Sequence, residues 1–135
     1  MEKLPLDHIG VAVKNLETAT IRYVNLLGAE IIHEEVVESQ GVKVRFLSHN
    51  NTLTELLQPL NDGSTLAKFL AKRGEGLHHV AYAVSDIYLE MERMRKAGYE
   101  LLQDQPFMGA REKLVFFIHP RSMGGVLVEI CQPKQ

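Results

Sequence analysis

Two histidines and two glutamates recur at corresponding places in the two halves of this 135-residue chain. His8 stands in LDHIGVAV and His79 in LHHVAYAV, 71 residues later. Glu55 stands in TELLQP and Glu129 in VEICQP, 74 residues later. A single histidine in a strand usually makes an ordinary hydrogen bond, but the joint recurrence favours a shared role. Imidazole nitrogens and carboxylate oxygens together suit divalent zinc, cobalt, nickel, manganese or iron, so we predict that these four side chains bind one metal ion per chain.

The other polar residues near these positions lack this repeat relation. His78 has the opposite strand parity to His79, so we expect a supporting or surface role for it. Asp7 suits a turn or the orientation of a ligand, and Cys131 suits a small core position. We expect ordinary hydrogen-bonded or surface roles for the remaining histidines, which are His33, His49 and His119.

Strand periodicity indicates how the four candidate ligands are positioned. Side chains alternate between the faces of a strand, so His8 shares a face with Gly10, which leaves space for a pocket. By the same parity, Glu55 lies between apolar neighbours on an inner face, as does Glu129. Burying an unpaired carboxylate there would be costly, and a cation bound by both residue types would compensate the charge.

Further matches show that the whole chain is a repeat of one module. LLGAEII matches KAGYELL, with Gly28 corresponding to Gly98. Asn15 and Asp86 are predicted N-caps of helices over 16–27 and 87–97, and each of these glycines ends its helix. Segments with strand character follow each helix, at 29–37, 42–48 and 52–58 in the first copy and at 99–103, 112–119 and 125–131 in the second.

The predicted fold class is therefore α+β, with two tandem β-α-β-β-β modules. Module one spans 6–59, a connecting helix spans 64–74 with Ser64 as its cap, and module two spans 77–133. We see no linker or low-complexity segment between the copies. We therefore expect a single domain over residues 1–135.

Composition excludes several classes of protein. The net charge of −2 provides no broad basic surface, so nucleic acid is not expected as a partner. No apolar run approaches the ~20 residues of a membrane span, and the first residues lack the apolar core of a signal peptide. Cys131 is the one cysteine, so an internal disulfide is excluded and a reducing, cytoplasmic location is expected.

The paired modules with their four candidate ligands resemble the vicinal oxygen chelate superfamily, which includes glyoxalase I. LLQPLNDGSTLAKFLAKRGEGLHHVAYAV, FFIHPRSMGGVLVEI and EEVVESQGVKVRFL are more similar to the methylmalonyl-CoA epimerase family within it. The resemblance implies an open, incompletely closed barrel around one metal. It also implies a metal-dependent isomerase that interconverts the C2 epimers of an acyl-CoA by removing and returning a proton through a metal-stabilised enolate.

The resemblance assigns roles to particular residues. Glu129 is expected to be the catalytic base as well as a ligand, and Lys113 and Ser122 are expected to bind substrate. Some members of the family carry a second glutamate on the strand after QGV, but this chain has Lys43, Val44 and Arg45 there, so water or another carboxylate, such as Glu38, is left to deliver the second proton. The cations that could line an entrance for the CoA phosphates are Lys43, Arg45, Arg111, Lys113 and Arg121. Members of the superfamily often form dimers, so a homodimer is expected.

Two other functions share parts of this pattern. A glyoxalase I-type lactoylglutathione lyase, acting on the hemithioacetal of glutathione or another thiol, would use the same four ligands. A small-ligand or drug-binding member would need no metal, so the intact ligand pairs disfavour it. A ring-opening dioxygenase is less favoured, because it would use two histidines and one carboxylate with open positions for oxygen.

Overall fold

The computed structural model describes residues 2–134, whose contacts divide the chain into two compact units. The first unit contains residues 8–78. The second unit combines the residues up to position 7 with those from 79 onward. The single domain over 1–135 remains a prediction. Among the described residues, no helix has both the length and the apolar character needed to cross a membrane.

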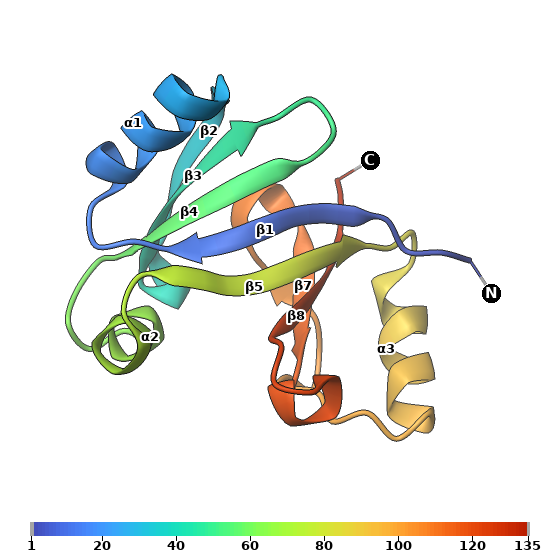
Figure 1. Cartoon of the computed structure of the whole chain (residues 1–135). Helices are drawn as coiled ribbons and strands as arrows, with labels where there is room; N and C mark the ends of the chain where they lie inside the picture. The colour runs from blue at the N-terminus through green and yellow to red at the C-terminus, as the bar shows by residue number, and fades with distance from the viewer. Residues whose placement is uncertain (1, 135) are drawn as a thin grey trace. The chain divides into compact units, whose positions relative to one another are not determined.

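The first unit contains the predicted module one from His8 onward and the connecting helix (Figure 1). Asn15 accepts a hydrogen bond from the backbone N–H of Thr18, and Gly28 ends the helix in the left-handed region with φ of 68°, as predicted. The sheet order is β2-β3-β4-β1, with β1 parallel to β4 and the other pairs antiparallel. The elements are β1 (Leu6–Ala12), α1 (Leu16–Leu27), β2 (Glu30–Val37), β3 (Val42–Ser48), β4 (Leu53–Pro59) and α2 (Thr65–Arg73).

The second unit repeats this pattern. Asp86 caps its helix by accepting from the N–H of Leu89, and the helix ends at Lys96, followed by Ala97 and then Gly98. The sheet order is β5-β8-β7-β6, and β5 is again parallel to the last strand of its module, β8. The elements are β5 (Gly76–Ala83), α3 (Ile87–Lys96), β6 (Phe107–Met108), β7 (Leu114–Ile118) and β8 (Val128–Gln132).

The strand predicted over 99–103 was wrong. Only an isolated bridge between Leu101 and Ile118 forms there, and the edge strand β6 lies further along the chain. Two backbone hydrogen bonds flank this bridge, from the N–H of Leu102 to the carbonyl of Phe117 and from the N–H of His119 to the carbonyl of Glu100, and side chains bind further backbone groups. The Gln103 amide oxygen accepts from the N–H of Phe117 at 2.8 Å, and Arg95 donates to the carbonyl of Asp104 at 2.6 Å. Backbone groups satisfied in this way have no need of a neighbouring strand.

A repeat-related glutamine joins the last strand of each module to the start of its helix. In β4, the Gln58 amide oxygen accepts a hydrogen bond from the N–H of Leu16 at 2.8 Å. In β8, Gln132 accepts from the N–H of Ile87 at the same distance. The first N–H groups of a helix have no acceptor within the helix, so each glutamine supplies an acceptor to a donor that would otherwise have none in the helix.

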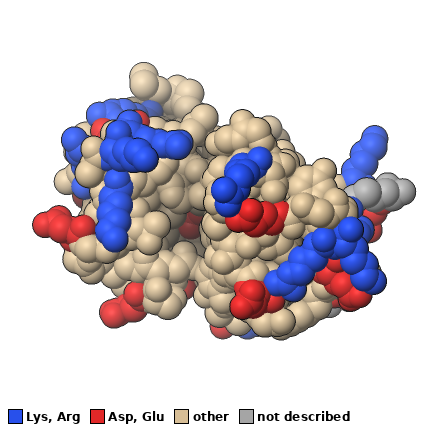
Figure 2. All heavy atoms as spheres, turned by 90° about the horizontal axis from the view of Figure 1, so that it is seen from below, with Lys and Arg blue, Asp and Glu red and all other residues tan. Residues whose placement is uncertain are grey.

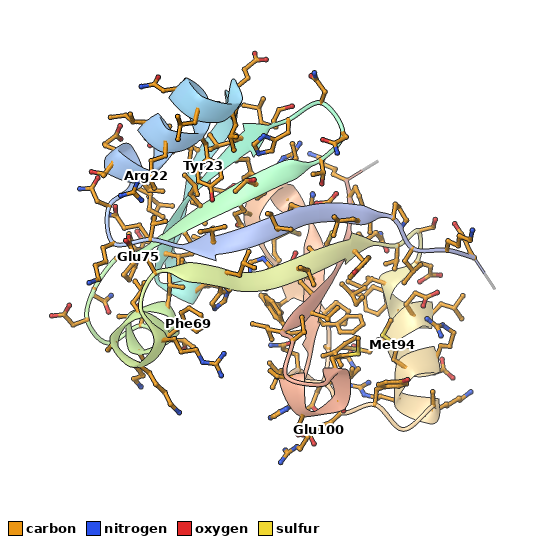
Figure 3. The ribbon with its side chains drawn as sticks, in the orientation of Figure 1. Arg22, Tyr23, Phe69, Glu75, Met94 and Glu100 are labelled. Atoms are coloured by element: carbon orange, nitrogen blue, oxygen red, sulfur yellow. The ribbon has the colours of Figure 1, made fainter. Side chains whose placement is uncertain are left out.

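The helix-facing side of each sheet holds an apolar core, as the strand parity predicted. Val13, Leu47 and Leu56 pack beside α1 in the first unit. In the second unit, Met94 of α3 belongs to the core cluster that includes Phe116 and Ile130 (Figure 3). The surface carries both signs of charge, interspersed with neutral side chains on the face drawn in Figure 2, which agrees with the small net charge. With one face of each sheet occupied by apolar packing, the opposite face is left for chemistry.

Candidate metal-binding and catalytic site

In the first unit, neighbouring parallel strands bring two of the candidate ligands together. Gly10 is the register partner of Glu55, so His8 in β1 and Glu55 in β4 stand on the same face. The His8 Nε2 lies 3.3 Å from the Glu55 Oε1, and both side chains are buried. The ring of Phe46 meets the His8 ring edge-on at 5.5 Å. The pair is therefore held in an apolar setting beside an aromatic wall.

The second unit holds an equivalent pair. Ala81 of β5 is the register partner of Glu129 in β8, and the His79 Nε2 lies 3.5 Å from the Glu129 Oε1. Both side chains are buried, and the Phe117 ring meets the His79 ring edge-on at 5.9 Å. The same four features, which are strand pairing, His–Glu contact, burial and an edge-on phenylalanine, occur in both units.

These pairs fit a divalent metal by donor type and by spacing. Their ring nitrogens and carboxylate oxygens could hold a metal ion. Two donors that each lie about 2.1 Å from one ion are about 3.0–3.4 Å apart, whereas N–H···O hydrogen bonds are usually about 2.9–3.0 Å. The observed separations within the pairs, 3.3 and 3.5 Å, lie closer to the first range. Buried carboxylates also need a compensating cation.

Two further polar groups of the second unit lie near Glu129 in the sequence or the sheet. Cys131 is fully buried, and burial is the main cause that raises the pKa of its thiol. A thiol that stays protonated is a poor metal ligand, in agreement with the predicted core role.

Lys113 is also buried, and its Nζ lies 2.6 Å from the Asp7 carboxylate. The predicted substrate-binding cation thus has an anionic partner at the start of β1.

Ser122 lies in a 3-10 turn over Pro120–Met123, between β7 and β8. Its hydroxyl accepts a hydrogen bond from the N–H of Glu100 at 3.0 Å, and the Glu100 carboxylate (Figure 3) binds Arg121 at 2.8 Å. The guanidinium holds the pKa of that carboxyl below its ordinary value. These contacts hold the turn against the segment that contains Glu100.

Arg45, which was expected to be available at an entrance, points to the helix-covered face. It donates to Thr20 of α1 at 2.9 Å and forms ion pairs with Glu17 and Glu34. The bound guanidinium lowers the pKa of both carboxyls, and their negative charges raise the pKa of Arg45. Arg45 therefore ties β3 to α1 and β2.

Three of the histidines have ordinary contacts, as predicted. His78 meets the ring of Phe69 on α2 at 4.8 Å (Figure 3). His49 Nε2 lies 2.7 Å from the Thr54 hydroxyl, and His119 accepts from the N–H of Arg121. The fourth, His33, also makes a hydrogen bond, and its partner is a carboxylate, because its Nε2 lies 2.8 Å from the Glu35 Oε1. Sequence reasoning missed this pair.

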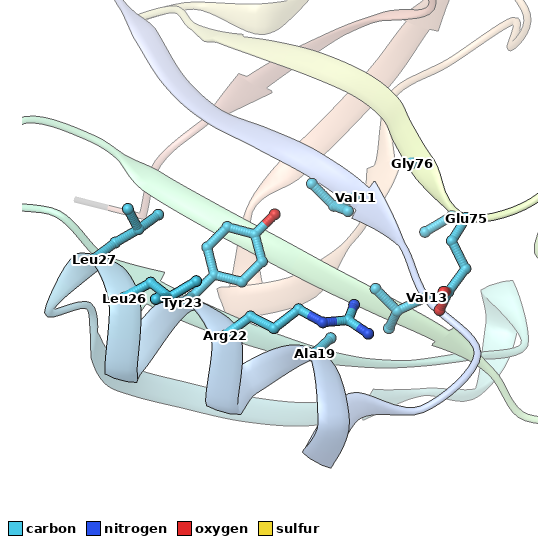
Figure 4. A pocket seen from close by; sticks show the side chains of 10 residues that line it. Val11, Val13, Ala19, Arg22, Tyr23, Leu26, Leu27, Glu75 and Gly76 are labelled. Atoms are coloured by element: carbon cyan, nitrogen blue, oxygen red, sulfur yellow. The ribbon is translucent and has the colours of Figure 1, made fainter.

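An apolar cavity of about 390 Å³ opens beside α1, and it is separate from the His–Glu face. Val11 and Val13 form its floor, and Tyr23 and Arg22 of α1 reach over it (Figure 4). Val11 has the opposite parity to His8 in β1, so this cavity lies on the other side of the sheet. The second unit has a larger cavity, of about 510 Å³, beside α3 on the corresponding face.

Comparisons with known proteins agree with this geometry. The profile of the Glyoxalase/Bleomycin resistance protein/Dioxygenase superfamily matches residues 7–117. An ethylmalonyl-CoA/methylmalonyl-CoA epimerase from Cereibacter sphaeroides is 42% identical over 129 residues, which cover 94% of this chain and 96% of that protein. Methylmalonyl-CoA epimerase from Mycobacterium tuberculosis has a crystal structure that matches with a TM-score of 0.93 at 36% identity, over 96% of this chain and 88% of that one.

A third match carries a ligand. The Streptomyces coelicolor methylmalonyl-CoA epimerase, solved in complex with 2-nitronate-propionyl-CoA, has a TM-score of 0.93 and 34% identity, over 97% of this chain and 96% of that one. These matches confirm the α+β glyoxalase-like fold predicted from the paired modules. The chain belongs to the glyoxalase/bleomycin resistance/dioxygenase superfamily and, within it, to the methylmalonyl-CoA epimerase family.

Proposed function

We propose that this protein is a metal-dependent methylmalonyl-CoA epimerase, an isomerase that interconverts the two C2 epimers of its substrate. The observation that carries the proposal is the pair of buried, repeat-related His–Glu contacts in a chain that is 42% identical to a named epimerase. His8 and Glu55 from one unit and His79 and Glu129 from the other bind one divalent ion. Zinc, cobalt, nickel and manganese all suit this donor set.

The residues divide the chemistry between them. A bound divalent metal would supply Lewis-acid stabilisation of the negative charge that develops on the thioester oxygen. Glu129 removes the C2 proton, so the C–H bond breaks and an O–H bond forms on the carboxyl group. Its buried position excludes water from the base, and the adjacent His79 fixes the orientation of its carboxylate.

The substrate class is a small acyl-CoA. The S. coelicolor relative binds an acyl-CoA analogue, which supports the same class here. Lys113 and Ser122 are the proposed contacts with it, since one is a buried ammonium group and the other carries a hydroxyl group in the turn between β7 and β8. A cytoplasmic homodimer is the proposed working state.

Proton exchange at C2 tests the proposal. One epimer of methylmalonyl-CoA, incubated in heavy water with metal-loaded protein, should become a mixture of both epimers with deuterium at C2. Glu129→Gln can still coordinate through its amide oxygen but lacks a base, so conversion between the epimers should fall by about 10²–10⁴-fold. A lyase of the glyoxalase I type would instead convert methylglyoxal and a thiol to a lactoyl thioester. Rapid formation of that product without deuterium uptake into methylmalonyl-CoA would contradict the proposal.

A further inference from the structure

The first unit carries a second His–Glu pair on β2 that the epimerase proposal has not used. His33 Nε2 lies 2.8 Å from Glu35 Oε1. Their side chains are 37% and 32% exposed, whereas that of Glu55 is 8% exposed. The carboxyl group of Glu35 is therefore accessible to a ligand, unlike the buried ligand pair.

The strand register puts this pair on the same face of the sheet as the candidate ligands. His33 is the register partner of Phe46 in β3, and Phe46 is the register partner of Glu55 in β4. Residues that are directly opposite in antiparallel strands point to the same face. The ring distances agree, because Phe46 lies 6.1 Å from His33 and 5.5 Å from His8. Phe46 thus stands between the two histidines on one surface.

A β-bulge creates this placement. Ile31 pairs with Leu47, but His33 pairs with Phe46, so β2 contains one extra residue. An insertion of one residue in a strand moves every following side chain to the other face. After the bulge, His33 and Glu35 face the ligand side, and Glu34 faces the helix side, where it binds Arg45. Bulges are frequent beside active sites, where they redirect a side chain.

Glu35 is a carboxylate on the same surface as Glu55. Inversion at C2 requires a second proton-transfer group besides Glu129, because the proton is removed from one face of the carbon and returned to the other. The strand after QGV presents Val44 to this surface, and an apolar side chain cannot transfer a proton. Glu35 is the register partner of Val44, and its strand lies two strand spacings, about 10 Å, from the strand of Glu55. Two side chains and a substrate carbon can span that distance.

We propose that Glu35 is the second proton-transfer residue of the reaction and that His33 is its positioning residue. This inference rests on the proposed epimerase function. When Glu129 has taken the proton from C2, protonated Glu35 gives its proton to the other face of the carbon. The Glu35 O–H bond breaks, the new C–H bond forms, and the electron pair of the carbanion becomes that bond. In the reverse direction the two glutamates exchange roles.

The test separates inversion from exchange. In heavy water, Glu35→Gln should lose conversion between epimers by about 10²–10⁴-fold, the usual contribution of one acid–base group. One epimer should still exchange its C2 hydrogen for deuterium with retained configuration, because Glu129 can remove and return a proton on its own face. His33→Ala should reduce inversion, and His33→Gln should restore it, because the glutamine amide keeps an N–H donor for Glu35.

Glu34→Gln is the matched control, because it changes the neighbouring glutamate on the opposite face. It should lower the melting temperature by weakening the Arg45 contacts and should leave inversion at the wild-type rate. Metal content and melting curves show whether Glu35→Gln is folded; if it is not, Glu35→Asp, which keeps a shorter carboxyl, should show the same excess of exchange over inversion.

Three results would overturn the inference. Inversion at the wild-type rate in folded Glu35→Gln would exclude this role while leaving the epimerase function intact. Loss of inversion in Glu38→Gln instead would assign the proton to the turn after β2. Wild-type protein that is loaded with metal and inverts no methylmalonyl-CoA would contradict the proposed function, and this inference with it.

Discussion

The four candidate ligands are buried groups that carry or accept charge, and each has its counterpart in the repeat. Removing one member of a buried His–Glu pair leaves the other without its partner, so affinity for metal should fall steeply. We expect His8→Ala, Glu55→Ala, His79→Ala and Glu129→Ala each to lose most of the one equivalent of metal that the wild-type protein binds. Metal analysis of dialysed protein measures this.

Two other histidines serve as controls for this prediction. His78 packs against Phe69, and His119 accepts a backbone hydrogen bond, so alanine at either position should leave the metal content unchanged. If His78→Ala lost the metal and His79→Ala kept it, the strand parity on which the ligand set depends would be wrong.

The sequence could predict the two buried His–Glu contacts because the same pair appears twice, and recurrence separates a shared role from an ordinary one. It could not predict the pair of His33 and Glu35, which has no repeat-related counterpart. The sequence EIIHEEVV does not reveal that the strand contains an extra residue at the bulge. That residue decides which face of the sheet His33 points to. A bulge arises from the backbone pairing between two strands, so it cannot be predicted from the side-chain pattern of one strand.

At the level of elements, helix boundaries were the most predictable feature, because their signals are local. The caps at Asn15, Ser64 and Asp86 all make the expected side-chain contacts. The failed strand over 99–103 depended on competition with distant groups, since Gln103 and Arg95 supply hydrogen bonds that the sequence pattern does not reveal. The sequence shows Gln58 and Gln132 at corresponding places in the repeat. It does not show that each of them caps a helix.

The glutamine caps give a stability prediction. Gln58→Leu leaves the partly buried N–H of Leu16 without its acceptor, which should cost about 1 kcal/mol of unfolding free energy, or about 3–4 °C in melting temperature. Gln58→Glu keeps an acceptor and adds a negative charge at the helix N-terminus, so it should melt at or above the wild-type temperature. Thermal unfolding followed by circular dichroism measures both. A Gln58→Glu variant as unstable as Gln58→Leu would show that the side chain acts through packing instead.

At the scale of the whole molecule, the duplicated module explains why each unit contains one of the two buried His–Glu pairs. Each unit has its own apolar core on the helix side of its strands. Neither unit supplies more than one histidine and one glutamate to the proposed ion. Metal binding should therefore stabilise the native chain only when both pairs are intact.

Removing the metal tests this requirement. Ligand binding to the native state adds about 2.7 kcal/mol to the unfolding free energy when free metal is about 100-fold above its dissociation constant, which corresponds to about 8–10 °C for a chain of this size. Chelation should lower the melting temperature of the wild-type protein by that order, because the buried carboxylates then lack their cation. His8→Ala and His79→Ala alter different units, yet each should abolish the metal-dependent shift. A full shift that persists in either variant would mean that a single unit binds the ion, and the two-pair site would be wrong.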